Sequence, residues 1–222
     1  MKFAAFETST EWCSVALWID GEIRGIEERA GSRHGELVLP MFERLAAGAG
    51  IAIAALDAVA FGAGPGSFTG LRIACGVAQG IAFARGLPVI GVSTLEAMAE
   101  ESGAARVVAC LDARMHEVYY SALEKAAGRW REVIAAQCVA PAQAPVPPGT
   151  GWTGCGNGFA AYGDVFRDRF STLYPEMHPG AAAVARLAAP RLAAGEGLDA
   201  ALAAPVYVRD KVAFTSEERR TR

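Results

Sequence analysis

Histidine and cysteine, the residues that most often bind transition metals, are scarce and scattered in this chain of 222 residues. The three histidines, His34, His116 and His178, include no pair at a spacing such as HxxxH, which would place two ligands on one helix face. The five cysteines are an odd number, lie far apart and form no CxxC pair, so they suit neither a disulfide framework nor a zinc site. We therefore predict no metal site and expect a reducing compartment.

Long apolar runs and an excess of basic residues are also missing. No window approaches the roughly 18 uncharged apolar residues of a membrane span, and the N-terminus turns polar after four apolar positions. We expect a cytoplasmic protein that does not bind membranes. The net charge of −3 argues against binding nucleic acid through bulk charge. With 52% hydrophobic and 20% charged residues, the chain is predicted to fold into one or two compact units.

The first half of the chain shows a run of strand signals and then alternating helix and strand signals. Strands are expected at residues 2–7, 13–19, 23–29, 58–61 and 88–92, with Asp20-Gly21 as a hairpin turn. Helices are expected at residues 35–47, with Pro40 near the start or kinking the helix, and at 67–85. Ser93 and Glu96 have the spacing of a capping box and predict another helix start. This order is typical of an α/β fold with a mixed sheet.

The second half repeats the pattern of the first. Residues 107–112 form an apolar segment that ends in Asp112, as the first strand ends in Glu7, 105 residues earlier. Glycines at 154, 156 and 158 precede a helical stretch, as Gly64 and Gly66 do. A duplicated α/β unit explains both similarities and predicts a first lobe at 1–104 and a smaller second lobe at 105–222. The proline-rich residues 141–149 are expected to be an extended loop, and the C-terminal tail, above all 215–222, to pack back or fray.

Residues 62–70, GAGPGSFTG, form a glycine-rich loop between a strand and a helix, where backbone N–H groups can bind a phosphate. The loop lacks the lysine of a Walker A motif, the third glycine of a dinucleotide motif and the flanking glycines of a nucleophile elbow. Two interpretations stay open. Either Ser67 caps the helix and the glycines make a tight turn, or Gly64, Gly66 and Ser67 bind a ligand. We predict no cofactor.

The strand-end carboxylates Glu7 and Asp112 also allow two interpretations. They can orient a metal-bound nucleotide in a two-lobed ATPase, or they can form turns, as acids at strand ends commonly do.

Two consecutive helices carry more apolar surface than one packed face requires. In the first, the apolar residues cover an arc of roughly 200°, where a stripe of about 100° suffices. In the second, only three residues between 68 and 84 are polar, and two glycines permit close helix approach. This excess favours a partner subunit, and a deep core closed by the second half is the alternative. The residues predicted to contact a partner are His34, Leu37, Val38, Met41, Phe42, Leu45, Arg72, Gly76, Gln79, Gly80 and Phe83.

Five blocks in this order resemble the TsaB (YeaZ) family over nearly the whole chain. They are FETSTEWCSVAL at 6–17, GAGPGSFTGLRIACGVAQGIAFARGLPVIGVSTLEAMA at 62–99, LDARMHEVYYSAL at 111–123, GCGNGF at 154–159 and PVYVRDKVAF at 205–214. The resemblance implies two ribonuclease H-like lobes of the sugar kinase, Hsp70 and actin (ASKHA) superfamily. It also implies a subunit of the bacterial machinery that makes threonylcarbamoyladenosine at position 37 of tRNAs reading ANN codons.

Within that family, the resemblance implies a non-catalytic role. The chemistry is expected in a homologous subunit, TsaD, with which this chain would form a heterodimer through the helices at 34–47 and 67–85. The ATPase TsaE would join the complex, tRNA would be met only through the complex, and the isolated chain could form a homodimer. Glu7 departs from the aspartate usual in the family, which weakens any nucleotide-metal role there. The alternative is an enzyme, an ATP-dependent phosphotransferase or a peptidase of the same superfamily.

Overall fold

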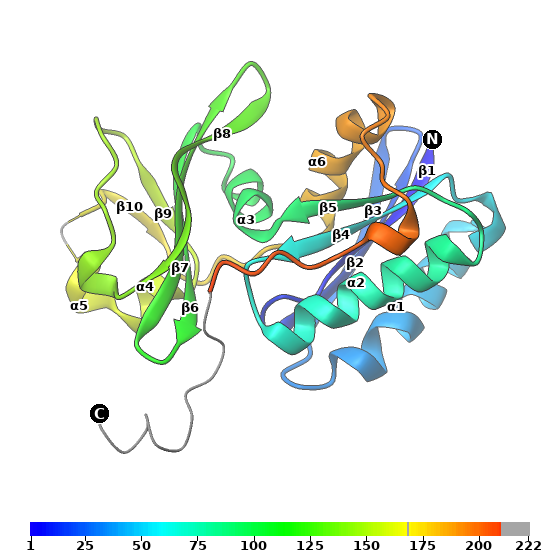
Figure 1. Cartoon of the computed structure of the whole chain (residues 1–222), viewed down its shortest axis with the longest axis horizontal. Helices are drawn as coiled ribbons and strands as arrows, with labels where there is room; N and C mark the ends of the chain where they lie inside the picture. Colours follow the sequence, from blue (N-terminus) through cyan, green and yellow to red (C-terminus); the bar gives the residue numbers. More distant parts are fainter. Residues whose placement is uncertain (168, 210–222) are drawn as a thin grey trace.

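The computed structural model describes residues 1–167 and 169–209, which form two α/β lobes side by side (Figure 1). Each lobe is built on a five-stranded mixed sheet. The predicted fraying of residues 215–222 falls outside the described residues.

The first sheet has the strand order β3-β2-β1-β4-β5. β1 pairs antiparallel with β2 and parallel with β4. Its strands match the five predicted segments closely, and they are β1 (Lys2–Glu7), β2 (Trp12–Ile19), β3 (Glu22–Arg29), β4 (Ala58–Gly64) and β5 (Val89–Ser93). The predicted hairpin turn is confirmed, because Asp20 and Gly21 join β2 to β3 with φ angles of 51° and 104°.

The second sheet repeats the connectivity of the first. Its strands are β6 (Arg106–Arg114), β7 (Glu117–Ala126), β8 (Arg129–Val139), β9 (Thr153–Cys155) and β10 (Thr172–Tyr174), in the order β10-β9-β6-β7-β8. β6 pairs antiparallel with β7 and parallel with β9, as β1 does with β2 and β4. The predicted duplication is therefore confirmed. The proline-rich residues 141–149 form one 3-10 turn, η2 (Pro141–Gln143), and then irregular chain.

The helices are α1 (His34–Ala49), α2 (Phe68–Phe83), α3 (Thr94–Ser102), α4 (Gly158–Ala161), α5 (Gly163–Phe166) and α6 (Ala181–Ala193), with 3-10 turns η1 (Ile53–Ala55) and η3 (Ala200–Leu202). Ser67 and Ser93 cap α2 and α3 as predicted, each accepting a backbone N–H bond of 3.4 Å. In the described residues no return bond joins the Glu96 side chain to Ser93, so the capping box is half formed. Pro40 lies inside α1, away from its start.

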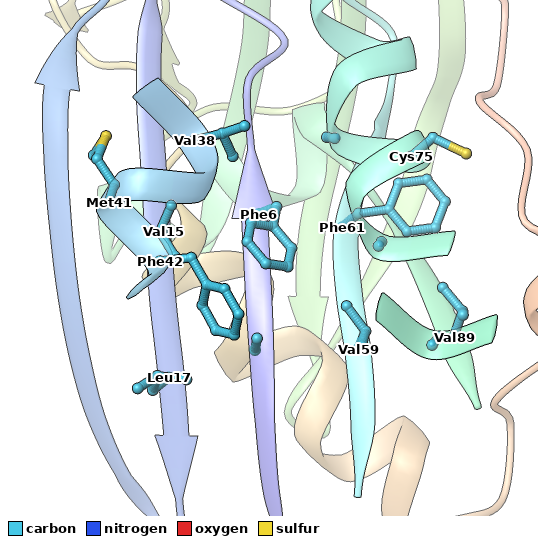
Figure 2. Packing of buried hydrophobic residues seen from close by; sticks show 14 of the residues in the cluster. Phe6, Val15, Leu17, Val38, Met41, Phe42, Val59, Phe61, Cys75 and Val89 are labelled. Atoms are coloured by element: carbon cyan, nitrogen blue, oxygen red, sulfur yellow. The ribbon is translucent and has the colours of Figure 1, made fainter. Parts of the chain in front are cut away.

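One face of the first sheet is covered by α1 and α2 (Figure 2). Val38, Met41 and Phe42 of α1 pack against the strands, and the Phe42 ring meets Phe6 edge-on with centroids 5.4 Å apart. Full burial of such a side chain is worth about 1.5–3 kcal/mol. One apolar core of the first lobe therefore lies between this sheet and these two helices.

The remaining two large helices are exchanged between the lobes. α6 covers the other face of the first sheet, where its alanines and Val184 pack with Phe3 and Ile90. α3 directly follows β5, yet Leu95 and Met98 pack with the apolar residues of the second sheet. The predicted division at residue 104 is corrected accordingly, because the first lobe includes α6 and the second lobe takes α3 into its core. Each sheet has two apolar faces, and a helix from either half can cover them.

No helix in the described part of the chain is both long enough and apolar enough to cross a membrane.

Candidate functional site

The glycine-rich loop between β4 and α2 packs directly on the turn that follows β1. The Ser67 N–H donates to the Ser9 carbonyl at 2.7 Å, and the Thr8 hydroxyl donates to the Gly70 carbonyl at 2.7 Å. A Cβ at Gly70 would lie 1.9 Å from the Thr8 carbonyl oxygen, and one at Gly66 would lie 2.6 Å from Ser9. The tight-turn interpretation of these glycines is confirmed, and ligand binding by the loop stays a prediction.

Gly64 has a different neighbour. Its φ is +118°, its peptide bond to Pro65 is cis, and an added Cβ would lie 2.6 Å from the carbonyl oxygen of Val206. The Val206 N–H in turn donates to the Ala63 carbonyl at 2.7 Å. Glycine at this position thus admits a segment from near the C-terminal end of the described chain.

Glu7 ends β1 with its carboxyl group inside the first lobe. The side chain is 1% exposed, Oε1 accepts the Ser9 N–H at 2.6 Å, and Oε2 has no hydrogen-bond partner among the described residues. Gly62 makes room for it, because a Cβ there would lie 1.8 Å from Oε2. Burial raises the pKa of the Glu7 carboxyl from 4.5 to about 7, although the hydrogen bond from the Ser9 N–H acts to lower it.

A cavity of about 560 Å³ lies between the lobes beside the loop. The first lobe lines it with Ser9, His34 and residues 65–71, and the second lobe with residues 111–115, Tyr119 and Asn157. Residues 206–209 complete the lining. The cavity thus joins the ends of several elements from both lobes.

The two strand-end carboxylates, Glu7 and Asp112, lie differently with respect to this cavity. Glu7 does not line the cavity, and the described residues contain no group of three His, Cys, Asp or Glu that could hold a metal ion. Asp112 does line it, but Oδ1 accepts the Arg114 N–H at 2.9 Å and Oδ2 pairs with the Arg114 guanidinium at 3.1 Å. The strand-end carboxylates therefore serve the turn and the core.

The three histidines lie apart. His34 begins α1 and is 6% exposed, with its Nε2 unpartnered among the described residues. His116 sits in the turn between β6 and β7 with a φ of 61°. His178 stacks on Trp12 with ring centroids 4.3 Å apart and faces Glu27 at 3.3 Å. They do not converge on one site.

On α1 the structure corrects part of the predicted partner surface. Val38, Met41 and Phe42 are at most 2% exposed and face the chain's own core, whereas His34, 6% exposed, lines the cavity between the lobes. The three apolar side chains offer no surface to a partner, because the first sheet occupies most of the apolar arc. Leu37 and Leu45 are half-buried at its margins. Leu39, outside the predicted set, is 45% exposed.

On α2 the predicted residues divide into two groups. Gly76, Gly80 and Phe83 are exposed, Phe83 by 72%, and a Cβ at either glycine would meet no described atom within 4 Å. Gln79 instead donates its side-chain N–H to the Ala200 carbonyl at 3.0 Å, so it serves an internal contact. Arg72 is exposed and donates from Nε to the Tyr207 hydroxyl at 3.1 Å.

Tyr207 and Arg209 are the residues that sequence reasoning missed. Both line the cavity, and both contact residues more than 90 positions earlier in the chain. No local pattern signals such contacts, because they depend on how the last described segment returns across both lobes.

The protein-family model that matches residues 25–214 is described as TsaD, tRNA N6-adenosine threonylcarbamoyltransferase. Among curated proteins, the tRNA threonylcarbamoyladenosine biosynthesis protein TsaB of Haemophilus influenzae is 38% identical over 96% of both chains. The protein of the same description from Escherichia coli is 36% identical over 96% of this chain and 97% of its own.

Two solved structures from Pseudomonas aeruginosa have the same fold over almost their full length. One, described as YeaZ, is 41% identical, covers 93% of this chain and 99% of its own, and has a TM-score of 0.88. The other, described as an uncharacterized protein with similarity to peptidase YEAZ, is 40% identical, covers 94% and 99%, and has a TM-score of 0.89.

Proposed function

Because the chain belongs to the TsaB (YeaZ) family of tRNA threonylcarbamoyladenosine biosynthesis proteins, we propose that it is the non-catalytic partner of a TsaD subunit. In this role it supports threonylcarbamoyl transfer to adenosine 37 of tRNAs reading ANN codons, by pairing with TsaD in a complex that TsaE joins. It contributes buried area and geometry, and no reacting group.

The observation that carries the proposal is the exposed face of α2. Gly76 and Gly80 lie one turn apart in the second half of the helix, and each glycine costs about 1 kcal/mol of helix stability relative to alanine. Nothing in the described chain uses the space they leave. At these two glycines the backbone of α2 is not covered by side chains, so a helix of a partner can pack closely against it beside Phe83. The matching family model is described as TsaD, so a homologous partner could present equivalent helices.

The placement of the two strand-end carboxyl groups, Glu7 and Asp112, supports the non-catalytic part of the proposal. The Glu7 carboxyl is turned into the core, and the Asp112 carboxylate is paired with Arg114. An ATP-dependent phosphotransferase or a peptidase remains the alternative, although no arrangement described above favours either. Calorimetry with ATP and magnesium on the isolated chain discriminates, since tight binding with turnover would contradict the proposal.

The remaining parts of the proposal concern location and other partners. We place the protein in the cytoplasm, where tRNA is modified, and we expect it to meet tRNA only through the complex, because the chain is net acidic. A homodimer through the same α2 face is the expected state when TsaD is absent.

Co-purification with TsaD from the same organism tests the interface. Gly76→Arg fills the close-approach site, and Leu39→Glu adds a charge to the exposed side of α1. We expect each substitution to weaken the complex by tenfold or more, on the order of an interface hot spot. The buried Met41 is unsuitable for this test, since a charge there would disturb folding.

Gly163→Arg is the matched control, because Gly163 is an exposed glycine at the start of α5 with no described atom within 4 Å of an added Cβ. It should leave the complex unchanged. If both test variants bind like the wild type, the surface is wrongly assigned. If the wild type does not bind, the partner is wrong.

A further inference from the structure

The last described segment, residues 203–209, is an extended strap that runs from the first lobe to the second (Figure 1). It leaves η3 beside α2, passes the glycine-rich loop through the Val206–Ala63 hydrogen bond and ends at the β6–β7 turn. It forms no helix or strand, and Val206 and Tyr207 are 54% and 45% exposed. The strap therefore depends on a few side-chain contacts.

The strap is anchored on the first lobe at the start of α2. The Tyr207 ring packs on Phe68 with centroids 5.4 Å apart, and its hydroxyl accepts the Arg72 bond. The Arg72 guanidinium lies 3.7 Å from the centre of the Phe68 ring. These three residues form one exposed cluster, which we call the Tyr207 anchor.

Arg209 fastens the strap to the second lobe. Nη2 donates to Glu117 at 2.6 Å and to the Arg114 carbonyl at 3.3 Å, and the guanidinium lies 5.8 Å from the centre of the Tyr119 ring. The Arg209 side chain is only 12% exposed, so this charge-assisted contact is partly shielded from water.

The strap forms part of the wall of the cavity between the lobes. Its residues 206–209 line that cavity together with the α2 start and the β6–β7 turn. The covalent connections between the lobes run from β5 directly into α3 and through residues 175–180. The strap is a third connection, and it is the one that can open without unfolding either sheet.

The Tyr207 anchor adjoins the exposed glycine face of α2. Arg72 precedes Gly76 by four residues, and residues at this spacing share one side of a helix. A protein seated on Gly76 and Gly80 would therefore reach Arg72, whose guanidinium is now engaged by Tyr207.

We propose that the strap is a releasable clamp on the two lobes, and that a protein docking on the α2 face competes with Tyr207 for Arg72 and so loosens the clamp. Docking and opening of the cavity are then linked, and each must alter the other by the same factor. The docking half of this inference rests on the proposed function, whereas the clamp itself does not.

Hydrogen exchange of the isolated full-length chain tests the clamp. Arg209→Ala should speed amide exchange about tenfold or more at residues 66–70 of the first lobe and 114–117 of the second, the factor that one charge-assisted hydrogen bond represents. Arg131→Ala, which removes a more exposed ion pair with Glu124 on the second lobe, is the matched control and should change neither segment. The unfolding midpoints of both variants are measured to check that the fold is retained.

Unchanged exchange in both segments, or faster exchange in the strap alone, would overturn the clamp. Equal acceleration by Arg131→Ala would do so too, since the effect would not be specific to the strap.

Affinity for the TsaD subunit tests the docking half. Releasing the strap in advance spares the partner that cost, so Arg209→Ala should bind TsaD about fivefold more tightly or better. A complex that forms with the same affinity within twofold would overturn the link. If the wild type forms no complex, the proposed function fails, and the exchange experiment alone decides the clamp.

Discussion

The carboxyl group of Glu7 shows how much one side chain depends on a residue far along the chain. A strand-end acid is predictable from the apolar segment before it, and the sequence leaves open whether such an acid faces a ligand or the core. Gly62, 55 positions later, decides the outcome, because only a residue without a Cβ leaves space for the carboxyl group. The pairing of β1 with β4 brings the two residues together.

The contribution of Glu7 to the stability of the protein should therefore fall as the pH rises from about 4.5 to about 7. The folded state keeps the Glu7 proton up to about pH 7, whereas the unfolded chain releases it near pH 4.5. Over that range Glu7 costs about 3 kcal/mol of unfolding free energy, and above pH 7 its contribution levels off. Glu7→Gln mimics the protonated acid and should remove this loss.

Urea titrations of the wild type and Glu7→Gln at pH 5, 6, 7 and 8 measure the difference. The unfolding free energy of Glu7→Gln should increase relative to that of the wild type as the pH rises. Glu36→Gln, which changes an exposed carboxyl on α1, should show the same pH dependence as the wild type. A constant difference between wild type and Glu7→Gln over this range would refute the titration of Glu7.

At the scale of elements, the periodicity of the sequence located the strands and the large helices well, and it was less informative about their faces. The wide apolar arc of α1 indicated more apolar surface than the chain itself would bury. The first sheet covers most of this apolar arc, because Val38, Met41, Phe42 and Ala46 are all buried. How much arc a sheet covers depends on the size of the opposing side chains, which no single helix reveals. On α2 the glycines kept their predicted exposure.

Two glycines of the same helix should respond oppositely to alanine. At Gly70 the new Cβ would overlap the Thr8 carbonyl, so we expect a loss of about 3 kcal/mol. At Gly76 the Cβ meets open space, and the gain in helix propensity should stabilise the chain by about 0.5–1 kcal/mol.

Thermal and urea unfolding of Gly70→Ala and Gly76→Ala check this pair, and each variant serves as the control for the other. A loss of stability in Gly76→Ala would show that another part of the free chain fills the space beside Gly76. It would remove the main support for a partner on α2.

At the scale of the whole molecule, the repeated strand and acid pattern was enough to predict a duplicated fold. The exchange of α3 and α6 was beyond that pattern. Both helices carry small and medium apolar residues that fit either sheet, so the apolar pattern alone does not say which sheet each helix covers. The cavity and the strap escaped prediction for a related reason, since both arise only where the two lobes meet.

A fragment ending at residue 104 should not fold as a stable unit. It would leave Phe3 and Ile90 without the cover of α6, and it would leave Leu95 and Met98 without the second sheet. We expect non-cooperative urea unfolding and strong binding of a hydrophobic dye. Co-expression with residues 105–222, which supply α6 and the second sheet, should restore a cooperative transition. A cooperative transition in the fragment alone would contradict this account of the core.

The exchanged helices also set the order of events during synthesis. β5 ends at Ser93, whereas α6 ends at Ala193, 100 residues later. At about 5–20 residues per second, the ribosome takes roughly 5–20 s to make that stretch. Throughout this interval, the apolar face of the first sheet that α6 covers in the folded protein has no such cover.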